Sequence, residues 1–318
     1  MIKVPKEFDA EEYRQWALDN IYYKMYSSKG SKTQNSIFNK LREHIQNDQM
    51  LNKDLRNYLL VESNLINLLV GSPKEILNSG ENLEGELFTK HFVKTRYPEL
   101  RTEFGGIISK KLNLRICPYC NRAYTFSVQK NLGGNTKTFQ LDHIYPKEKY
   151  PYLAINIFNL VPVCAACNHD KLNFSDEFIN PFEQSWDKSG VAFKWKYSDE
   201  TERLVELIPH TEDFEIYINH KDIDFVKNSI QALGLEEIYS EHKTEALEII
   251  KLAQKYNTSY IEELSKYEGL NLNEFKIKRD LLGPNLDAKD HHKRPLAKFT
   301  RDIAEDVGFL KPVEPPDS

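Results

Sequence analysis

Apolar positions in the first third of the chain recur with the period of a helix. Residues 11–26, 36–45 and 55–70 all have this spacing, so each is predicted to form a helix whose apolar face packs in the core. Gly71-Ser72-Pro73 predicts a stop followed by a new helix start. We therefore expect residues 1–105 to form a mainly helical region.

The centre of the chain has a different pattern, in which aromatic and β-branched residues alternate with turn residues. The elements expected here are strands over 123–129, 136–144 and 160–163, a turn at 132–135, and a helix over 165–172. The centre is thus predicted to form strands and loops followed by a helix.

Short strands and further helices are predicted after the centre. The elements expected here are strands over 191–197, 204–208 and 214–219, and helices over 222–233, 235–267 (with a break near Asn257) and 295–307. Residues 289–294 (KDHHKR) are predicted to be a solvated basic loop, and the proline-rich residues 311–318 a disordered tail.

Composition fits a folded protein of the α+β class that is mainly helical. The 318 residues are 40% hydrophobic and 29% charged, and they divide into expected segments 1–105, 106–220 and 221–318. The first residues, MIKVPKEFDAEE, have no apolar signal-peptide core. Residues 150–169 lack charged side chains but contain prolines and asparagines that a membrane span would not tolerate. We expect a cytoplasmic protein without a membrane segment.

Charge is distributed unevenly along the chain. Residues 107–175 contain nine Lys or Arg against three Asp or Glu, although the whole chain has a net charge of −5. A basic segment in an acidic protein is typical of a local site for a polyanion such as nucleic acid.

All four cysteines lie in two C-x-x-C pairs, Cys117 with Cys120 and Cys164 with Cys167. Two residues between cysteines let a tight turn direct both sulfurs at one metal, and two such turns complete a tetrahedral set for structural Zn²⁺. An iron–sulfur cluster is an alternative, but it usually has other spacings. The absence of an export signal argues against disulfides. The sequence therefore predicts a zinc site that clamps the two ends of the central insert.

Polar residues inside this insert form a second candidate site. Asp142 and His143 end one predicted strand, Asn159 precedes the next, and Asn168 lies one helical turn before Lys171. Carboxylate and amide oxygens suit Mg²⁺ or Mn²⁺. A neutral imidazole accepts a proton from water near neutral pH, and an ammonium contacts a phosphate oxygen. These residue types meet the needs of phosphodiester hydrolysis.

Four motifs resemble those of the HNH (ββα-metal) endonuclease family. They are C-P-Y-C at 117–120, L-D-H-I-Y-P-K at 141–147, N-L at 159–160 and C-A-A-C-N-H-D-K at 164–171, which together span about a fifth of the chain. The resemblance implies a central zinc-stabilised ββα-metal module. In that module Asp142 and Asn168 would bind the catalytic Mg²⁺ or Mn²⁺, His143 would be the general base and Asn159 would hold the loop that aims the histidine.

Two features depart from this pattern or leave it open. Many family members carry Gly-Gly soon after D-H-x-x-P, whereas residues 147–152 here read K-E-K-Y-P-Y. His169 neighbours Asn168 and competes with it as the metal ligand. Because residues one apart on a helix point about 100° apart, both should not bind one ion, and the N-x-x-K spacing favours Asn168.

The resemblance implies a metal-dependent endonuclease that hydrolyses DNA and leaves 5′-phosphate and 3′-hydroxyl ends. Residues 117–171 are also similar to the HNH subunit of Septu-type anti-phage systems, which implies antiviral defence beside an ATPase partner. Two alternatives stay open. One is an RNA or tRNA nuclease, since the motif contacts phosphate rather than the sugar, and the other is a non-catalytic zinc subunit that binds nucleic acid.

Overall fold

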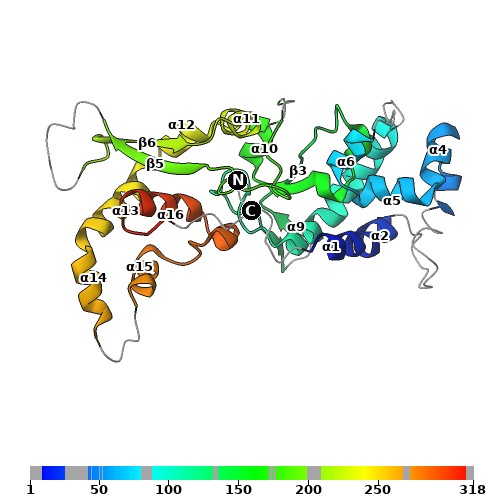
Figure 1. The fold of residues 1–318 in the computed structure, drawn as a ribbon. Helices are drawn as coiled ribbons and strands as arrows, with labels where there is room; N and C mark the ends of the chain where they lie inside the picture. Colours follow the sequence, from blue (N-terminus) through cyan, green and yellow to red (C-terminus); the bar gives the residue numbers. More distant parts are fainter. Residues whose placement is uncertain are drawn as a thin grey trace. The chain divides into compact units, whose positions relative to one another are not determined.

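The computed structural model of the chain describes residues 9–312, with gaps at 26–41, 44, 50, 52, 80–87, 132–134, 172–173, 175–176, 199–208 and 268–272. The described residues are mainly helical and contain three two-stranded antiparallel sheets (Figure 1). The predicted α+β class with a helical majority is therefore confirmed. No helix among these residues is both long enough and apolar enough to cross a bilayer.

The chain divides into two compact units. The N-terminal unit comprises Lys6–Asn113 and Thr125–Asn168, and the C-terminal unit comprises Met1–Pro5, Leu114–Tyr124 and His169–Ser318. The three expected segments run consecutively along the chain, whereas these two units interleave. The predicted strand pair at 136–163 belongs to the same unit as the N-terminal helices.

Helices at the start of the N-terminal unit follow the predicted periodicity. Helix α1 (Ala10–Ala17) begins at Asp9, whose carboxylate accepts hydrogen bonds from Glu11 N and Glu12 N, and it continues through a π-helical segment (Leu18–Tyr22) into α2 (Tyr23–Met25). The next helices are α4 (Lys53–Leu60), α5 (Glu62–Val70) and α6 (Pro73–Asn78). The helices predicted at 11–26 and 55–70 are confirmed, the second with a break at residue 61. The helix predicted at 36–45 lies mostly outside the described residues.

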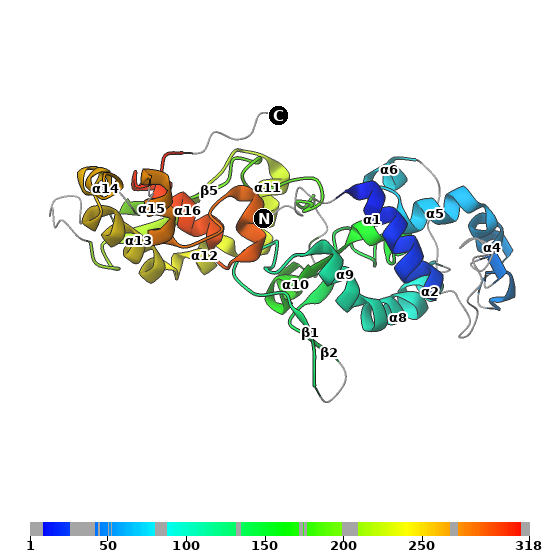
Figure 2. The ribbon, with the colours of Figure 1, turned by 90° about the horizontal axis from the view of Figure 1, so that it is seen from below.

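A second helical run leads into the centre of the chain. It comprises π-helical Thr89–Arg96, α8 (Tyr97–Glu99), π-helical Leu100–Phe104 and α9 (Gly105–Leu112). Beside α9 lies a hairpin of β1 (Ser127–Gln129) and β2 (Asn135–Lys137) (Figure 2). A Cβ atom on Gly106 would come within 2.7 Å of Ser127 Oγ, so glycine allows this close approach.

The strand expected over 136–144 is two strands. Strand β2 ends at Lys137, and after residues 138 and 139 β3 (Gln140–His143) pairs antiparallel with β4 (Leu160–Val163). Thr138 is the reason for the break, because its N–H donates to Phe126 O and its hydroxyl accepts from Phe126 N at 2.7 Å. The predicted strand at 160–163 is confirmed, and helix α10 (Ala165–Lys171) follows it as expected.

The C-terminal unit is a two-stranded sheet covered by helices. Strands β5 (Ala192–Tyr197) and β6 (Phe214–Asn219) pair antiparallel, and both confirm their predictions. The strand predicted at 204–208 lies outside the described residues. The helices that follow are α11 (Asp224–Ala232), α12 (Leu235–Ser240), α13 (Lys243–Lys255), α14 (Thr258–Ser265), α15 (Glu274–Leu282) and α16 (Ala297–Asp306). The single helix expected over 235–267 is thus three helices. The expected break near Asn257 is confirmed, because this side chain caps α14.

The solvated basic loop expected at 289–294 is found only in part: Lys289 and Lys293 are exposed, but the segment is helical and buries its histidines. Residues Ala288–Lys293 form a 3₁₀ helix in which the imidazoles of His291 and His292 are buried. Burial lowers the pKa of His291 to about 4, and its Nε2 lies 2.9 Å from the Leu286 carbonyl oxygen. The spacing gave no sign of this, because the segment also packs against distant residues such as Asn121, whose side chain donates to His291 O. Lys311 and Pro312 are exposed, and the rest of the predicted tail lies outside the described residues.

Candidate functional site

The four cysteines form a buried cluster whose Sγ atoms all lie within 4.8 Å of one another. A tetrahedral Zn²⁺ with bonds of about 2.3 Å needs sulfurs about 3.8 Å apart, so small side-chain adjustments complete the set. The chemistry also fits, because four thiolates are a typical set for a structural zinc ion. The cluster is compatible with the zinc site predicted from the two C-x-x-C pairs.

Asn121 shapes the first cysteine turn, and sequence reasoning missed it. The residue has a left-handed backbone (φ 51°), and its N–H donates to Cys117 O at 2.9 Å, which closes the turn. Its side chain donates to His291 O at 2.9 Å and accepts from Lys298 N at 3.1 Å. The turn is thereby fastened to the buried 3₁₀ helix and to α16. An asparagine directly after C-x-x-C was the available signal, because asparagine tolerates φ > 0.

Strand β3 carries Asp142 and His143, both less than 10% exposed, and His143 pairs with Leu160 of β4. The His143 Nε2 atom lies 2.9 Å from Ala154 O. A carbonyl oxygen only accepts hydrogen bonds, so this contact places the proton on Nε2 and leaves Nδ1 as the basic nitrogen of the neutral ring.

Asn159 fixes the loop that follows His143. Its buried side chain accepts from Tyr145 N at 2.7 Å and donates to Tyr145 O and Leu153 O at 3.1 and 3.0 Å. Its backbone carbonyl also accepts from Ile144 N at 3.0 Å. One side chain therefore ties the start of the loop to its middle, immediately before β4 begins.

The loop follows a defined path although the Gly-Gly pair is absent. Pro146 O accepts from Lys149 N at 3.1 Å and from Tyr150 N at 2.8 Å, which makes a tight turn. Farther along, the buried Asn156 amide donates to Leu68 O and Gly71 O at 2.9 and 3.1 Å. The side chain of this loop residue thus fastens the loop to backbone carbonyls at the end of α5.

Tyr97 contacts the candidate base and was not anticipated from the sequence. Its hydroxyl donates to Leu141 O at 2.9 Å, and its ring centroid lies 4.4 Å from that of His143, with the planes tilted by 57°. Burial raises the pKa of Tyr97 to about 12, so the phenol keeps its proton and remains a donor at neutral pH. No motif could have found this residue, since Tyr97 and Leu141 are 44 positions apart.

Helix α10 brings Asn168 to strand β3. The Asn168 Nδ2 donates to Gln140 Oε1, and Gln140 and Asp142 are two positions apart on the strand, so their side chains face the same side. Asn168 therefore lies at the face of β3 that carries Asp142. The neighbouring His169 is exposed.

Lys171 is enclosed rather than open to solvent. The residue is 4% exposed, and its ammonium lies 5.8 Å from the ring centroid of Tyr119 and 5.1 Å from that of Phe178. This environment suits a structural cation–π contact. It does not provide the open approach that a substrate phosphate needs.

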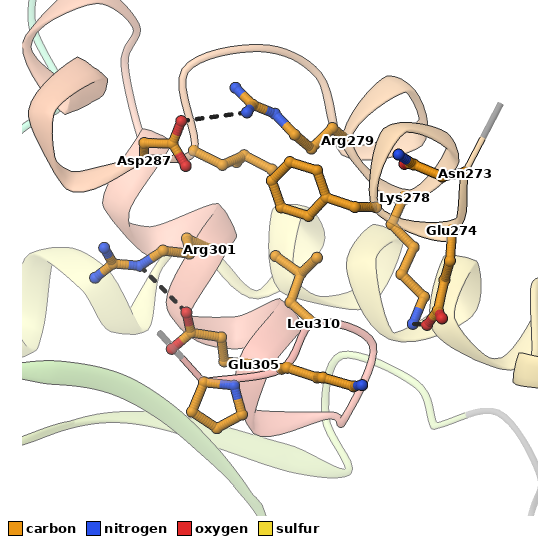
Figure 3. A pocket seen from close by; sticks show the side chains of 12 residues that line it. Asn273, Glu274, Lys278, Arg279, Asp287, Arg301, Glu305 and Leu310 are labelled. Carbon is orange, nitrogen blue, oxygen red and sulfur yellow. Dashed lines mark hydrogen bonds and ion pairs between the residues drawn. The ribbon is translucent and has the colours of Figure 1, made fainter. Parts of the chain in front are cut away.

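The C-terminal unit also contains a cavity of about 460 Å³ (Figure 3), and the residues that line it are distant in sequence from those described above. Several of its charged side chains are already paired. Lys278 lies 2.6 Å from Glu274, and Arg279 lies 3.2 Å from Asp287. The cavity presents charges of both signs and has no cluster of catalytic groups, so we do not include it in the candidate site.

Comparisons with protein-family models, with curated proteins and with solved structures find no match to this chain. Any function proposed for it therefore depends on its own residues.

Proposed function

We propose that this protein is a metal-dependent endonuclease of the HNH type that hydrolyses phosphodiester bonds, with DNA as the favoured substrate. One observation carries the proposal. Asp142 and His143 end a strand that pairs with β4, Asn159 holds the intervening loop, and Asn168 of the following helix contacts the strand face shared with Asp142. The cysteine cluster at the ends of this segment supports the same reading.

Two kinds of metal ion fit the donor sets. The four thiolates would hold structural Zn²⁺ and take no part in chemistry. The Asp142 carboxylate and the Asn168 amide oxygen are hard donors that would hold Mg²⁺ or Mn²⁺. When bound, this second ion supplies a positive charge that stabilises the developing negative charge on the leaving oxygen.

His143 would act as the general base. Ala154 O holds the Nε2 proton, so Nδ1 is the nitrogen that accepts a proton from water as the water attacks phosphorus. General-base assistance of this kind accelerates a reaction about 10²- to 10⁴-fold. Tyr97 and Asn159 keep the imidazole in one orientation, the first by ring contact and the second through the loop.

The proposed substrate and partner rest on the distribution of charge along the chain and on the sequence of the motifs. The surplus of cations over residues 107–175 favours nucleic acid, and the resemblance favours DNA and an ATPase partner in antiviral defence. An RNA-cleaving enzyme and a non-catalytic binding subunit are the other candidates. Incubating the zinc-loaded protein with plasmid, single-stranded DNA and RNA, with and without a co-purifying ATPase and ATP, separates these three.

The decisive variant is His143→Ala. Wild-type protein should nick or linearise DNA with Mg²⁺ or Mn²⁺ and stop when EDTA is added, whereas His143→Ala should lose about 10²- to 10⁴-fold in rate while remaining folded. His220→Ala, in the loop after β6, is the matched control and should cleave like wild type. Equal cleavage by His143→Ala, or no cleavage of any of the substrates by wild type, contradicts the proposal.

A further inference from the structure

The phosphate contact expected of Lys171 needs another residue, because Lys171 is buried and its ammonium lies against the rings of Tyr119 and Phe178. Phosphodiester hydrolysis still requires a positive charge on the phosphate oxygens as negative charge accumulates there. The loop after β3 offers two lysines, Lys147 and Lys149, within the same compact unit as His143.

Lys147 is the one that shares an aromatic neighbour with the imidazole. Its Nζ lies 5.9 Å from the ring centroid of Tyr97, and the same ring lies 4.4 Å from that of His143. A single aromatic ring thus contacts both groups. Lys149 lies instead over Tyr150, at 5.4 Å from that ring centroid. We propose that Lys147, and not Lys171, contacts the phosphate on which His143 acts, an inference that rests on the proposed nuclease function.

The position of Lys147 is fixed, while its ammonium stays reachable. The turn from Pro146 to Tyr150 is closed by two backbone hydrogen bonds, and Asn159 holds Tyr145 at its start. The Lys147 side chain is 25% exposed, compared with 4% for Lys171 as a whole residue. The backbone therefore fixes where the side chain begins, and solvent access allows a substrate phosphate to meet its ammonium.

Lys147 already forms an ion pair with a neighbouring carboxylate. Its Nζ lies 2.8 Å from Glu148 Oε1, and Glu148 is 66% exposed. An ion pair this open to water is weak, so an arriving phosphate can replace the carboxylate without loss of a strong contact. The phosphate offers more acceptor oxygens and more charge than the carboxylate does.

Tyr97 acts here as a positioning residue. Its hydroxyl is anchored on Leu141 O in β3, so the ring keeps a set place near both the imidazole and the ammonium. The face of an aromatic ring attracts a cation, which favours the ammonium remaining at this site when Glu148 is displaced. The arrangement links helix α8, strand β3 and the following loop in one contact set.

The test compares single-lysine variants of the full zinc-loaded chain in Mg²⁺-dependent cleavage of a labelled duplex. Lys147→Ala should lower kcat/KM about 10- to 100-fold, because a charge-assisted contact is lost, and Lys147→Arg should restore most of it. Lys149→Ala is the matched control from the same turn and should change the rate less than about threefold, as expected for an exposed charge outside the contact set.

The outcomes separate this inference from the proposed function. If wild type cleaves and His143→Ala does not, but Lys147→Ala cleaves like wild type, the inference is overturned and the nuclease proposal stands. A selective loss in Lys171→Ala, with an unchanged thermal midpoint, also overturns it. If wild type cleaves no nucleic acid, both fail together.

Discussion

Replacing Asn159 by aspartate is a near-isosteric change that tests how the loop after His143 is held. The carboxylate still accepts from Tyr145 N, but the two bonds donated to Tyr145 O and Leu153 O are lost. At about 1 kcal/mol for each bond, this alone costs about 2 kcal/mol. The new carboxylate also faces two carbonyl oxygens at a fully buried position, so its pKa in the folded state should rise above the ordinary value of about 3.9.

The sign of the pH dependence follows from that raised pKa. The folded state binds a proton more tightly than the unfolded state, so Asn159→Asp is least stable relative to wild type at neutral pH and recovers as the pH falls towards 5. Each unit by which the pKa rises adds about 1.4 kcal/mol to the cost at pH 7. Asn159→Ala loses all three side-chain bonds, costs about 3 kcal/mol, and shows no such recovery.

Urea unfolding followed by tryptophan fluorescence at pH 7 and pH 5.5 measures both variants against wild type. The difference in unfolding free energy between Asn159→Asp and wild type should shrink at the lower pH, and cleavage at pH 7 should fall in both variants. A destabilisation below about 0.5 kcal/mol at pH 7, or one that is the same at both pH values, would refute the account of how this side chain fixes the loop.

Two further predictions concern the cysteine cluster and the buried histidine. Cys117→Ser should lower both the amount of bound zinc, measured by inductively coupled plasma mass spectrometry, and the midpoint temperature of thermal unfolding. A variant that binds one zinc per chain and is as stable as wild type would exclude the proposed clamp. Because burial lowers the folded-state pKa of His291 to about 4, wild-type stability should fall as pH drops from 6.5 towards 4, by up to about 1.4 kcal/mol per unit from this residue. His291→Gln, which keeps a donor for Leu286 O, should lose that part of the slope in urea titrations, and an unchanged slope would contradict the assignment.

Local spacing was sufficient to predict three features around the candidate site, although it merged β2 and β3 into one strand. The two C-x-x-C pairs predicted the cysteine cluster, and the strand at 160–163 and the helix from 165 are where the pattern indicated. The strand and the helix depend on residues that are close in sequence. The cysteine cluster depends on a spacing that lets both sulfurs of a pair reach one metal ion. The assignments of DNA as substrate, of an ATPase partner and of Mg²⁺ at Asp142 stay predictions.

Contacts between residues far apart in sequence could not be predicted in the same way. Tyr97 meets Leu141 and His143 only because helix α8 packs beside β3, and Asn121 meets His291 across 170 positions. The run KDHHKR at 289–294 gave a misleading signal for a related reason. This run suggests a solvated loop, but packing covers both imidazoles. Lys171 is expected to be exposed, but it is buried with its ammonium against Tyr119 and Phe178.

The most direct test of the central claim is single-turnover cleavage of an end-labelled DNA duplex by the zinc-loaded protein, with the ends of the products identified. Wild type with Mg²⁺ or Mn²⁺ should give 5′-phosphate and 3′-hydroxyl ends, and His143→Ala at equal folded concentration should be about 10²- to 10⁴-fold slower. Identical products and rates from the two proteins would contradict the claim.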